Sequence, residues 1–216
     1  MQIKRLFNKF NELQKIYGDK NSDAICGCGD ITKPKLCLVF MNPTAKNVSA
    51  NKKWQGIKAP WLGTKNVWKM FFQLGLINKD IIAKINSKKP SDWDYKFAET
   101  VYHEIANNHI YITNLSKATQ ADARALSDKV FKQYLDIFKE EINIIKPKII
   151  ITFGNQVSSI LLNKNIKVSD YRKKYEELQI NSQTYKVFPI YYPIGQGMRN
   201  INIAKEDIDW IIKNMI

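Results

Sequence analysis

The sequence lacks the features that mark membrane and secreted proteins. No stretch approaches the roughly 18 consecutive apolar residues that cross a bilayer. Residues 1–18 carry apolar side chains at helical spacing, without the uninterrupted apolar core and small-residue cleavage site of a signal peptide. We therefore expect a cytoplasmic protein with no membrane segment.

Residues that bind metals or form disulfides are scarce. The chain has three cysteines, Cys26, Cys28 and Cys37, and two histidines, His103 and His109. An odd number of cysteines in a chain expected to be cytoplasmic argues against a disulfide framework. Structural metal sites usually need four ligands, and the close pair of cysteines supplies two. We expect neither a metal nor a cofactor.

Several catalytic patterns are also missing, and acidic residues are few. There is no glycine-rich phosphate loop with a lysine, no defensible Ser, His and Asp order, and no paired catalytic carboxylates. The 34 Lys and Arg residues outnumber the 20 Asp and Glu residues, which gives a net charge of +14. That excess predicts a polyanionic partner. A solvated lysine surface in a compositionally biased chain is the alternative.

Four short apolar runs predict the core of the fold. With 216 residues, 44% of them hydrophobic, the chain suits a single domain over residues 1–216. We expect an N-terminal helix and lead-in over 1–35 and the core over 36–212. The four runs are continuous rather than alternating, which favours parallel strands covered on both faces. They comprise residues 36–41, 110–113, 148–153 and 187–191.

Helical patterns lie between these runs. Thr64 is expected to cap a helix that ends near Gly75, and Ser127 to cap one that stops before Pro147. Further helices are expected over 155–162 and 204–215. The alternation predicts a three-layer α/β/α sandwich with a central, mainly parallel, four-stranded sheet. Residues 78–107 show no clear pattern, and residues 167–186 predict an irregular or helical excursion or a short hairpin.

Polar residues follow every expected strand. Ligands of a parallel sheet bind beyond the carboxyl ends of its strands. Side-chain amides suit base edges or an ordered water, and exposed N–H groups suit phosphates. An ordinary turn is the alternative for any one of them. Together, on a basic chain, they indicate a ligand site; they are Asn42-Pro43-Thr44, Asn114-Leu115-Ser116-Lys117, Gly154-Asn155-Gln156 and residues 192–200.

Five segments in order resemble a known family. They read LVFMNPTA, KWQGIKAPWLGTKNVWKMF, IYITNLSKA, KPKIIITFGNQVSSILL and YYPIGQGMRN. Over about residues 36–212 the chain is similar to the uracil-DNA glycosylase superfamily. The motif order is closest to its thermostable iron–sulfur branch. That branch has a cysteine after the lysine of IYITNLSKA, where this chain has Ala118, so a four-cysteine cluster is not expected.

The resemblance implies an enzyme that flips a deaminated base, uracil or hypoxanthine, out of DNA and hydrolyses its N-glycosidic bond. It places Asn42 at the attacking water, Trp61 against the base and Asn114 at the base edge, with Met41 beside them. Tyr192 stands near the usual position of a histidine that stabilises the leaving anion, and its hydroxyl is a candidate replacement. The residues expected to contact DNA are Thr44, Lys46, Lys65, Lys117, Gly195, Gln196 and Arg199.

Alternatives remain open at this point. Trp61 suits a core position, Asn42 and Asn114 suit strand-ending turns, and Arg199 suits a surface ion pair. The first motif has no carboxylate, so the water would be positioned by an amide alone. No lysine is an obvious Schiff-base nucleophile, so we expect a monofunctional enzyme. We also expect a monomer. The rivals are a non-catalytic DNA- or nucleotide-binding protein on the same scaffold and a hydrolase of nucleosides or other small molecules.

Overall fold

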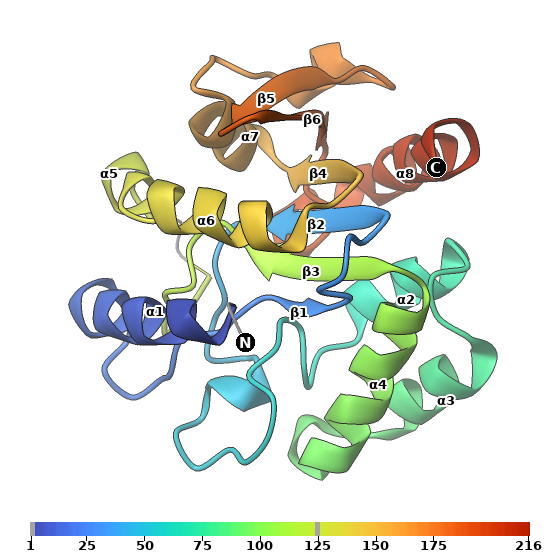
Figure 1. The fold of residues 1–216 in the computed structure, drawn as a ribbon. Helices are drawn as coiled ribbons and strands as arrows, with labels where there is room; N and C mark the ends of the chain where they lie inside the picture. Colours follow the sequence, from blue (N-terminus) through green and yellow to red (C-terminus); the bar gives the residue numbers. More distant parts are fainter. Residues whose placement is uncertain (1–2, 124–125) are drawn as a thin grey trace.

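A mixed six-stranded sheet forms the centre of the molecule. The computed structural model describes residues 3–123 and 126–216. The sheet has the strand order β1-β3-β2-β4-β6-β5 (Figure 1). The strands are β1 (Cys28–Gly29), β2 (Leu36–Phe40), β3 (Ile110–Asn114), β4 (Ile149–Phe153), β5 (Glu176–Ile180) and β6 (Gln183–Ile190).

The four inner strands are parallel, and the two outer ones are antiparallel to their neighbours. In the centre, Leu38 of β2 pairs with Ile112 of β3 and with Ile151 of β4. Every residue of these three strands is buried, as their continuous apolar runs predict. The expectation of four strands is wrong, because the sheet gains β1 and β5 at its edges. β1 has only two residues and β5 is largely polar, so neither has an apolar signal.

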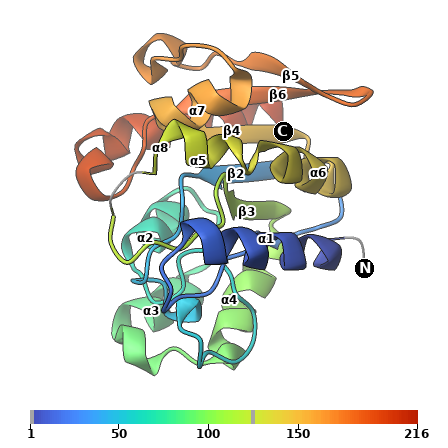
Figure 2. The same cartoon turned by 90° about the vertical axis from the view of Figure 1, so that its left-hand side faces the viewer.

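Helices cover both faces of the sheet, which makes three layers (Figures 1 and 2). One face packs against α2 (Asn66–Gln73), α3 (Lys79–Ser87), α4 (Tyr95–Asn107) and α8 (Ile201–Met215). The other packs against α5 (Asp128–Lys132), α6 (Leu135–Ile145) and α7 (Asn155–Leu162). Helix α1 (Lys4–Tyr17) lies outside this second layer and packs on α6. None of the described helices is long and apolar enough to cross a membrane.

Two helix expectations are wrong in detail. Thr64 does not cap α2: the N-cap is Lys65, and the Thr64 hydroxyl donates to the carbonyl of Trp61 at 2.7 Å. The expected single helix from Ser127 to residue 145 is interrupted after Lys132, so that α5 and α6 are separate. The apolar pattern alone continues across the break, because Tyr134 is fully buried there.

The two segments without a clear sequence pattern, residues 78–107 and 167–186, contain regular secondary structure. Residues 78–107 form α3, a 3-10 turn η2 (Pro90–Asp92) and α4. Asn78 and Asp94 cap the two helices by accepting from backbone N–H groups. Residues 167–186 contain the turn η3 (Val168–Tyr171) and most of the β5–β6 hairpin, which was one of the sequence-based alternatives.

Candidate functional site

An aromatic cluster lies at the carboxyl edge of the parallel strands. Phe40, the last residue of β2, stacks on Phe153 of β4 with ring centroids 4.4 Å apart. The rings of Trp61 and Tyr192 meet Phe40 edge-on, at 4.9 and 6.2 Å. Side chains alternate across a sheet, so Phe40 and Phe153 share the face of α2, α4 and α8. Four separate segments therefore meet at this apolar site.

Asn114 lies beside the cluster, and its side-chain amide is available to a ligand. It ends β3, is paired in register with Phe40 and is 2% exposed. Its neighbour but one, Ile112, packs on the α2, α4 and α8 face, and alternation points Asn114 to that same face. Among the described residues no hydrogen-bond partner is found for its side-chain amide. Its amide atoms are not among the fully buried ones, so they reach the open edge and can form hydrogen bonds with a ligand there.

Asn42 offers an acceptor at the same edge. It follows β2 and is partly exposed. Its Nδ2 donates to the carbonyl of Pro43 at 3.1 Å, which orients the amide. Within the described part of the chain its Oδ1 has no donor, so it is available to accept a hydrogen bond from water. Just beyond, Thr44 forms a parallel bridge with Gln120, which anchors the turn to the segment after β3.

Trp61 is held in a strained backbone conformation. Its φ of 66° is unusual for a bulky residue. Its carbonyl accepts three hydrogen bonds, from the N–H and hydroxyl of Thr64 and from the indole of Trp68, at 3.1, 2.7 and 3.1 Å. Its own indole Nε1 is buried and has no hydrogen-bond partner among the residues that the structure describes. Strain fixed by surrounding bonds is characteristic of functional positions.

Tyr192 and the loop after it complete the edge. Loss of hydration around the ring raises the pKa of Tyr192 to about 12, so its hydroxyl keeps its proton at neutral pH and remains a donor. The loop continues as a 3-10 turn η4 (Gly195–Asn200). A Cβ at Gly197 would collide with the carbonyl of Tyr192, so only glycine allows this close packing.

The expected DNA contacts fall into different environments. Lys46, Gly195 and Arg199 are exposed. Lys65 is also at the surface, where its Nζ donates to the carbonyl of Asn86 at 2.6 Å. The side chain of Gln196, also expected at DNA, lies outside the described part of the chain.

Two of the expected positions need correction. Lys117 cannot contact DNA, because its side chain is wholly buried in an ion pair with Glu141 at 2.6 Å. The side chain of Met41 does not join the aromatic cluster, because it packs against the opposite face of the sheet. At Met41 the backbone alone lies at the edge, where its carbonyl accepts from the N–H of Ser116 at 3.1 Å.

Sequence reasoning missed the residue at the centre of the cluster. Phe40 contacts three other rings, yet it reads as one more apolar residue of a core strand. Phe153 is hidden in the same way at the end of β4. The usable signal is position: each is the last residue of its strand, and both strands are parallel, so the two rings must meet at one edge.

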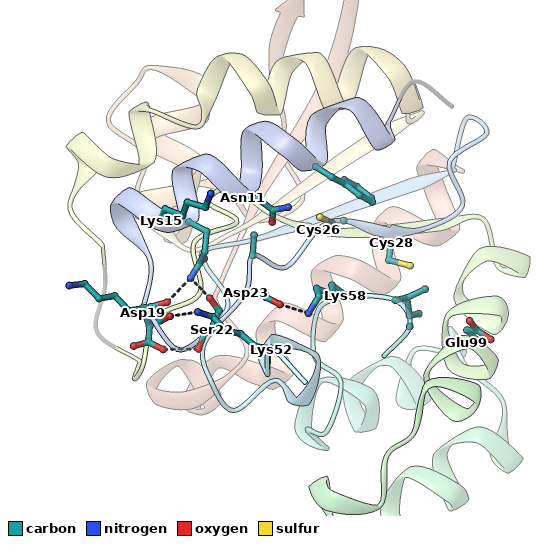
Figure 3. A pocket seen from close by; sticks show the side chains of 17 residues that line it. Asn11, Lys15, Asp19, Ser22, Asp23, Cys26, Cys28, Lys52, Lys58 and Glu99 are labelled. Atoms are coloured by element: carbon teal, nitrogen blue, oxygen red, sulfur yellow. Dashed lines mark hydrogen bonds and ion pairs between the residues drawn. The ribbon is translucent and has the colours of Figure 1, made fainter. Parts of the chain in front are cut away.

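A second hollow lies away from this edge. A cleft of about 980 Å³ is bounded by α1, residues 19–28 and the loop that contains Lys52 and Lys58 (Figure 3). In it Lys58 pairs with Asp23 at 2.6 Å. Cys26 and Cys28 also line it, and desolvation by burial raises the pKa of each thiol to about 12, so both are neutral.

The iron–sulfur cluster of the resembled branch does not fit this chain. Three cysteines cannot supply four ligands, and the position after Lys117 is an alanine. Cys37 lies inside β2 and packs on the α5, α6 and α7 face. Among the described residues no group of three or more His, Cys, Asp or Glu side chains is arranged to hold a metal ion.

Comparison with known proteins agrees with this geometry. No curated protein sequence matches the chain. The model of the Uracil DNA glycosylase superfamily matches residues 26–210. This span contains all six strands and every residue of the aromatic cluster. The chain therefore belongs to the uracil-DNA glycosylase superfamily.

Proposed function

We propose that this protein is a monofunctional DNA glycosylase that removes a deaminated base, uracil or hypoxanthine, from DNA. The observation that carries the proposal is the amide of Asn114, which has no partner among the described residues and whose backbone pairs with Phe40 of the aromatic cluster. A flipped base needs hydrogen bonds at its edge and an aromatic or apolar surface against its face. This edge of the sheet offers both within one cluster.

We assign the positioning of the attacking water to Asn42. The bond from its Nδ2 to Pro43 leaves Oδ1 directed away from the turn as an acceptor. An amide orients a water but takes up its proton poorly, so the chemistry depends on making the base a good leaving group. We therefore expect slow turnover compared with an enzyme that has a carboxylate here.

We assign the stabilisation of the leaving base to Asn114 and Tyr192. Breaking the glycosidic bond places negative charge on the base, and preorganised donors aimed at that charge lower the barrier. The Asn114 amide supplies N–H donors, and the Tyr192 hydroxyl is a protonated donor at the same cluster. A neutral phenol thus takes the place of the histidine that the family commonly uses.

We expect DNA to bind the surface around this edge. Lys46 and Arg199 supply exposed positive charge for phosphates, and partly exposed Lys65 adds to it. Met198 of η4 is 44% exposed, and the amide of Asn66 contacts its sulfur at 3.6 Å. An exposed apolar side chain on this loop suits insertion between base steps, which holds a kinked duplex open.

Strand cleavage by alkali tests the activity. Labelled duplex and single-stranded oligonucleotides carrying uracil, hypoxanthine or neither are incubated with protein from a host that lacks its own uracil glycosylase. We expect alkali-dependent breaks at the deaminated base, and no covalent enzyme–DNA product after borohydride treatment. The breaks should disappear in Asn42→Ala and persist in Asn107→Ala, an exposed asparagine at the opposite end of the strands.

Two features of the sequence favour a second function. The first motif has no carboxylate, and Tyr192-Pro193 stands where a histidine is expected. A non-catalytic DNA-binding protein on this scaffold would bind the same oligonucleotides with strong salt dependence and produce no abasic site. Tight binding without breaks at any lesion would replace the first function by this one.

A further inference from the structure

A fully buried polar network lies on the other face of β3 from the aromatic cluster. Lys117 Nζ is 2.6 Å from Glu141 Oε2 and 2.8 Å from Thr113 Oγ1. Glu141 Oε1 accepts from the hydroxyls of Tyr111 and Thr113 at 2.8 and 3.0 Å. Lys117 is 0% and Glu141 1% exposed at the side chain. The charged pair is therefore saturated by partners from β3 and α6.

The surroundings seal this network from water. Lys117 Nζ lies over the rings of Phe10 and Phe138, at 5.2 and 5.3 Å from their centroids. A Cβ at Gly27 would collide with the Tyr111 hydroxyl and the Glu141 carboxylate, so the lead-in chain closes directly over them. Burying a charge pair costs more than an apolar replacement in many proteins. Stability alone does not explain why this pair is placed here.

One bond connects the network to the candidate site. Lys117 Nζ donates to the carbonyl of Asn114 at 2.5 Å. That carbonyl belongs to the last residue of β3, where the regular strand pairing ends. The next peptide is held in turn by the N–H of Leu115 donating to the carbonyl of Phe40 at 2.8 Å. The backbone of Asn114 is thus held at its carbonyl and at the following peptide, although its side chain has no described partner.

We propose that Lys117 and Glu141 are positioning residues that hold the Asn114 amide in the orientation that binds the flipped base. Glu141 and Thr113 fix the ammonium group, and the ammonium group fixes the Asn114 carbonyl. A side chain without its own hydrogen bonds depends on such a support to keep one direction. The consequence for base recognition rests on the proposed glycosylase function; the orientation of Asn114 does not.

Two variants separate positioning from stability. Lys117→Met with Glu141→Gln removes both charges, keeps an acceptor for the Tyr111 and Thr113 hydroxyls, and deletes the donor to Asn114. Glu141→Gln alone keeps the lysine and its bond to Asn114 but leaves its charge without a counter-ion. We expect the single variant to have the lower thermal midpoint, because an uncompensated buried charge is the costlier defect.

The first measurement reads Asn114 directly. Protein labelled with nitrogen-15 asparagine gives side-chain amide signals, and Asn114 is assigned by its loss in Asn114→Ala. We expect the Asn114 signal to shift and broaden in the double variant and to stay near its wild-type position in Glu141→Gln. The buried amide of Asn47, bonded to Ala59 and Ser49, serves as the internal reference. An unchanged Asn114 signal in the double variant would overturn the proposal.

The second measurement is single-turnover removal of uracil. A small displacement of a recognition group costs about 100-fold in rate, and we expect that loss in the double variant despite its higher stability. The control is Arg172→Met with Asp207→Asn, which removes an ion pair between the end of η3 and α8, with a buried aspartate and a partly exposed arginine. An equal loss in the control would assign the effect to stability and overturn the positioning role. Should the wild type remove no base, the glycosylase function fails, and the amide signals still decide the proposal.

Discussion

Asn42 and Asn114 stand at the ends of neighbouring strands, yet their environments are opposite. Asn42 is partly exposed and its amide is already bonded to Pro43. Asn114 is buried, and its amide has no partner among the described residues. A polar group on a partly exposed residue is satisfied by bulk water, whereas the amide of a residue that is only 2% exposed meets little besides what enters the site. This difference supports the proposed roles, in which Asn42 positions the attacking water and Asn114 binds the base.

The difference comes from the turn after each strand. After β2 the chain passes through buried Pro43 and reaches the surface at Ala45 and Lys46. After β3 the chain turns inward, where Lys117 reaches back to the carbonyl of Asn114. One strand end is open to solvent and the other is closed by a buried ion pair. An enzyme that flips a base needs both, because the base must be sequestered while water reaches the sugar.

The largest expected effect is at Asn42, at the end of β2 that is open to solvent. Asn42→Ala should lower the single-turnover rate of base removal about 1,000-fold, because no other described group at this turn is assigned to orient the water. Asn42→Asp should retain or exceed the wild-type rate, since a carboxylate can also accept the proton. Gel analysis of alkali-treated oligonucleotides measures both. A wild-type rate in Asn42→Ala would contradict the role of Asn42 in positioning the water, and with it the proposed difference between the two strand ends.

The next effect is at the closed end. Asn114→Ala should lower kcat/KM for uracil-containing DNA about 100-fold, through the lost base-edge hydrogen bonds. Its free energy of unfolding should change little, because the Asn114 amide makes no hydrogen bond with the residues that the structure describes. Asn47→Ala is the control: it deletes bonds to Ala59 and Ser49, and should cost about 1–3 kcal/mol in urea unfolding. A comparable destabilisation by Asn114→Ala would contradict the unpartnered amide.

A smaller effect is expected at Trp61 of the aromatic cluster. Trp61→Ala should weaken binding of an oligonucleotide with a non-hydrolysable deoxyuridine analogue by about 10-fold, since base–aromatic stacking contributes about 1–3 kcal/mol. Trp61→Phe should bind nearly as the wild type. Fluorescence anisotropy measures the binding. Equal affinities for Trp61→Ala and wild type would return Trp61 to a purely structural role.

The smallest effect concerns the surface beyond the open end. Lys46→Ala should reduce the slope of log K against log salt by about one, with a few-fold loss of affinity. Lys35→Ala is the matched control, because this exposed lysine precedes β2 at the opposite end of the sheet. Titrations at several salt concentrations measure the slope. Equal slopes for both variants would place the DNA elsewhere.

Part of the fold was predictable because its signal is local. The continuous apolar runs at 36–41 and 148–153 predicted buried parallel strands, and β2 and β4 lie there. The edge strand β1 was missed because two residues hold no periodicity. At the site, Asn114 could be named from the chain, but its neighbour Phe40 could not. An aromatic residue ending a strand looks the same whether it meets a pocket or the core.

The sequence by itself determined the layered fold, the family likeness and the order of the polar turns, because apolar spacing and short motifs are written along the chain. The tertiary structure alone decided which side chains are open and which are closed. Lys117 reads as a surface cation until Glu141 of α6, Phe10 of α1 and the carbonyl of Asn114 surround it. The burial of a charge depends on groups brought together from distant segments, and no local pattern contains that information.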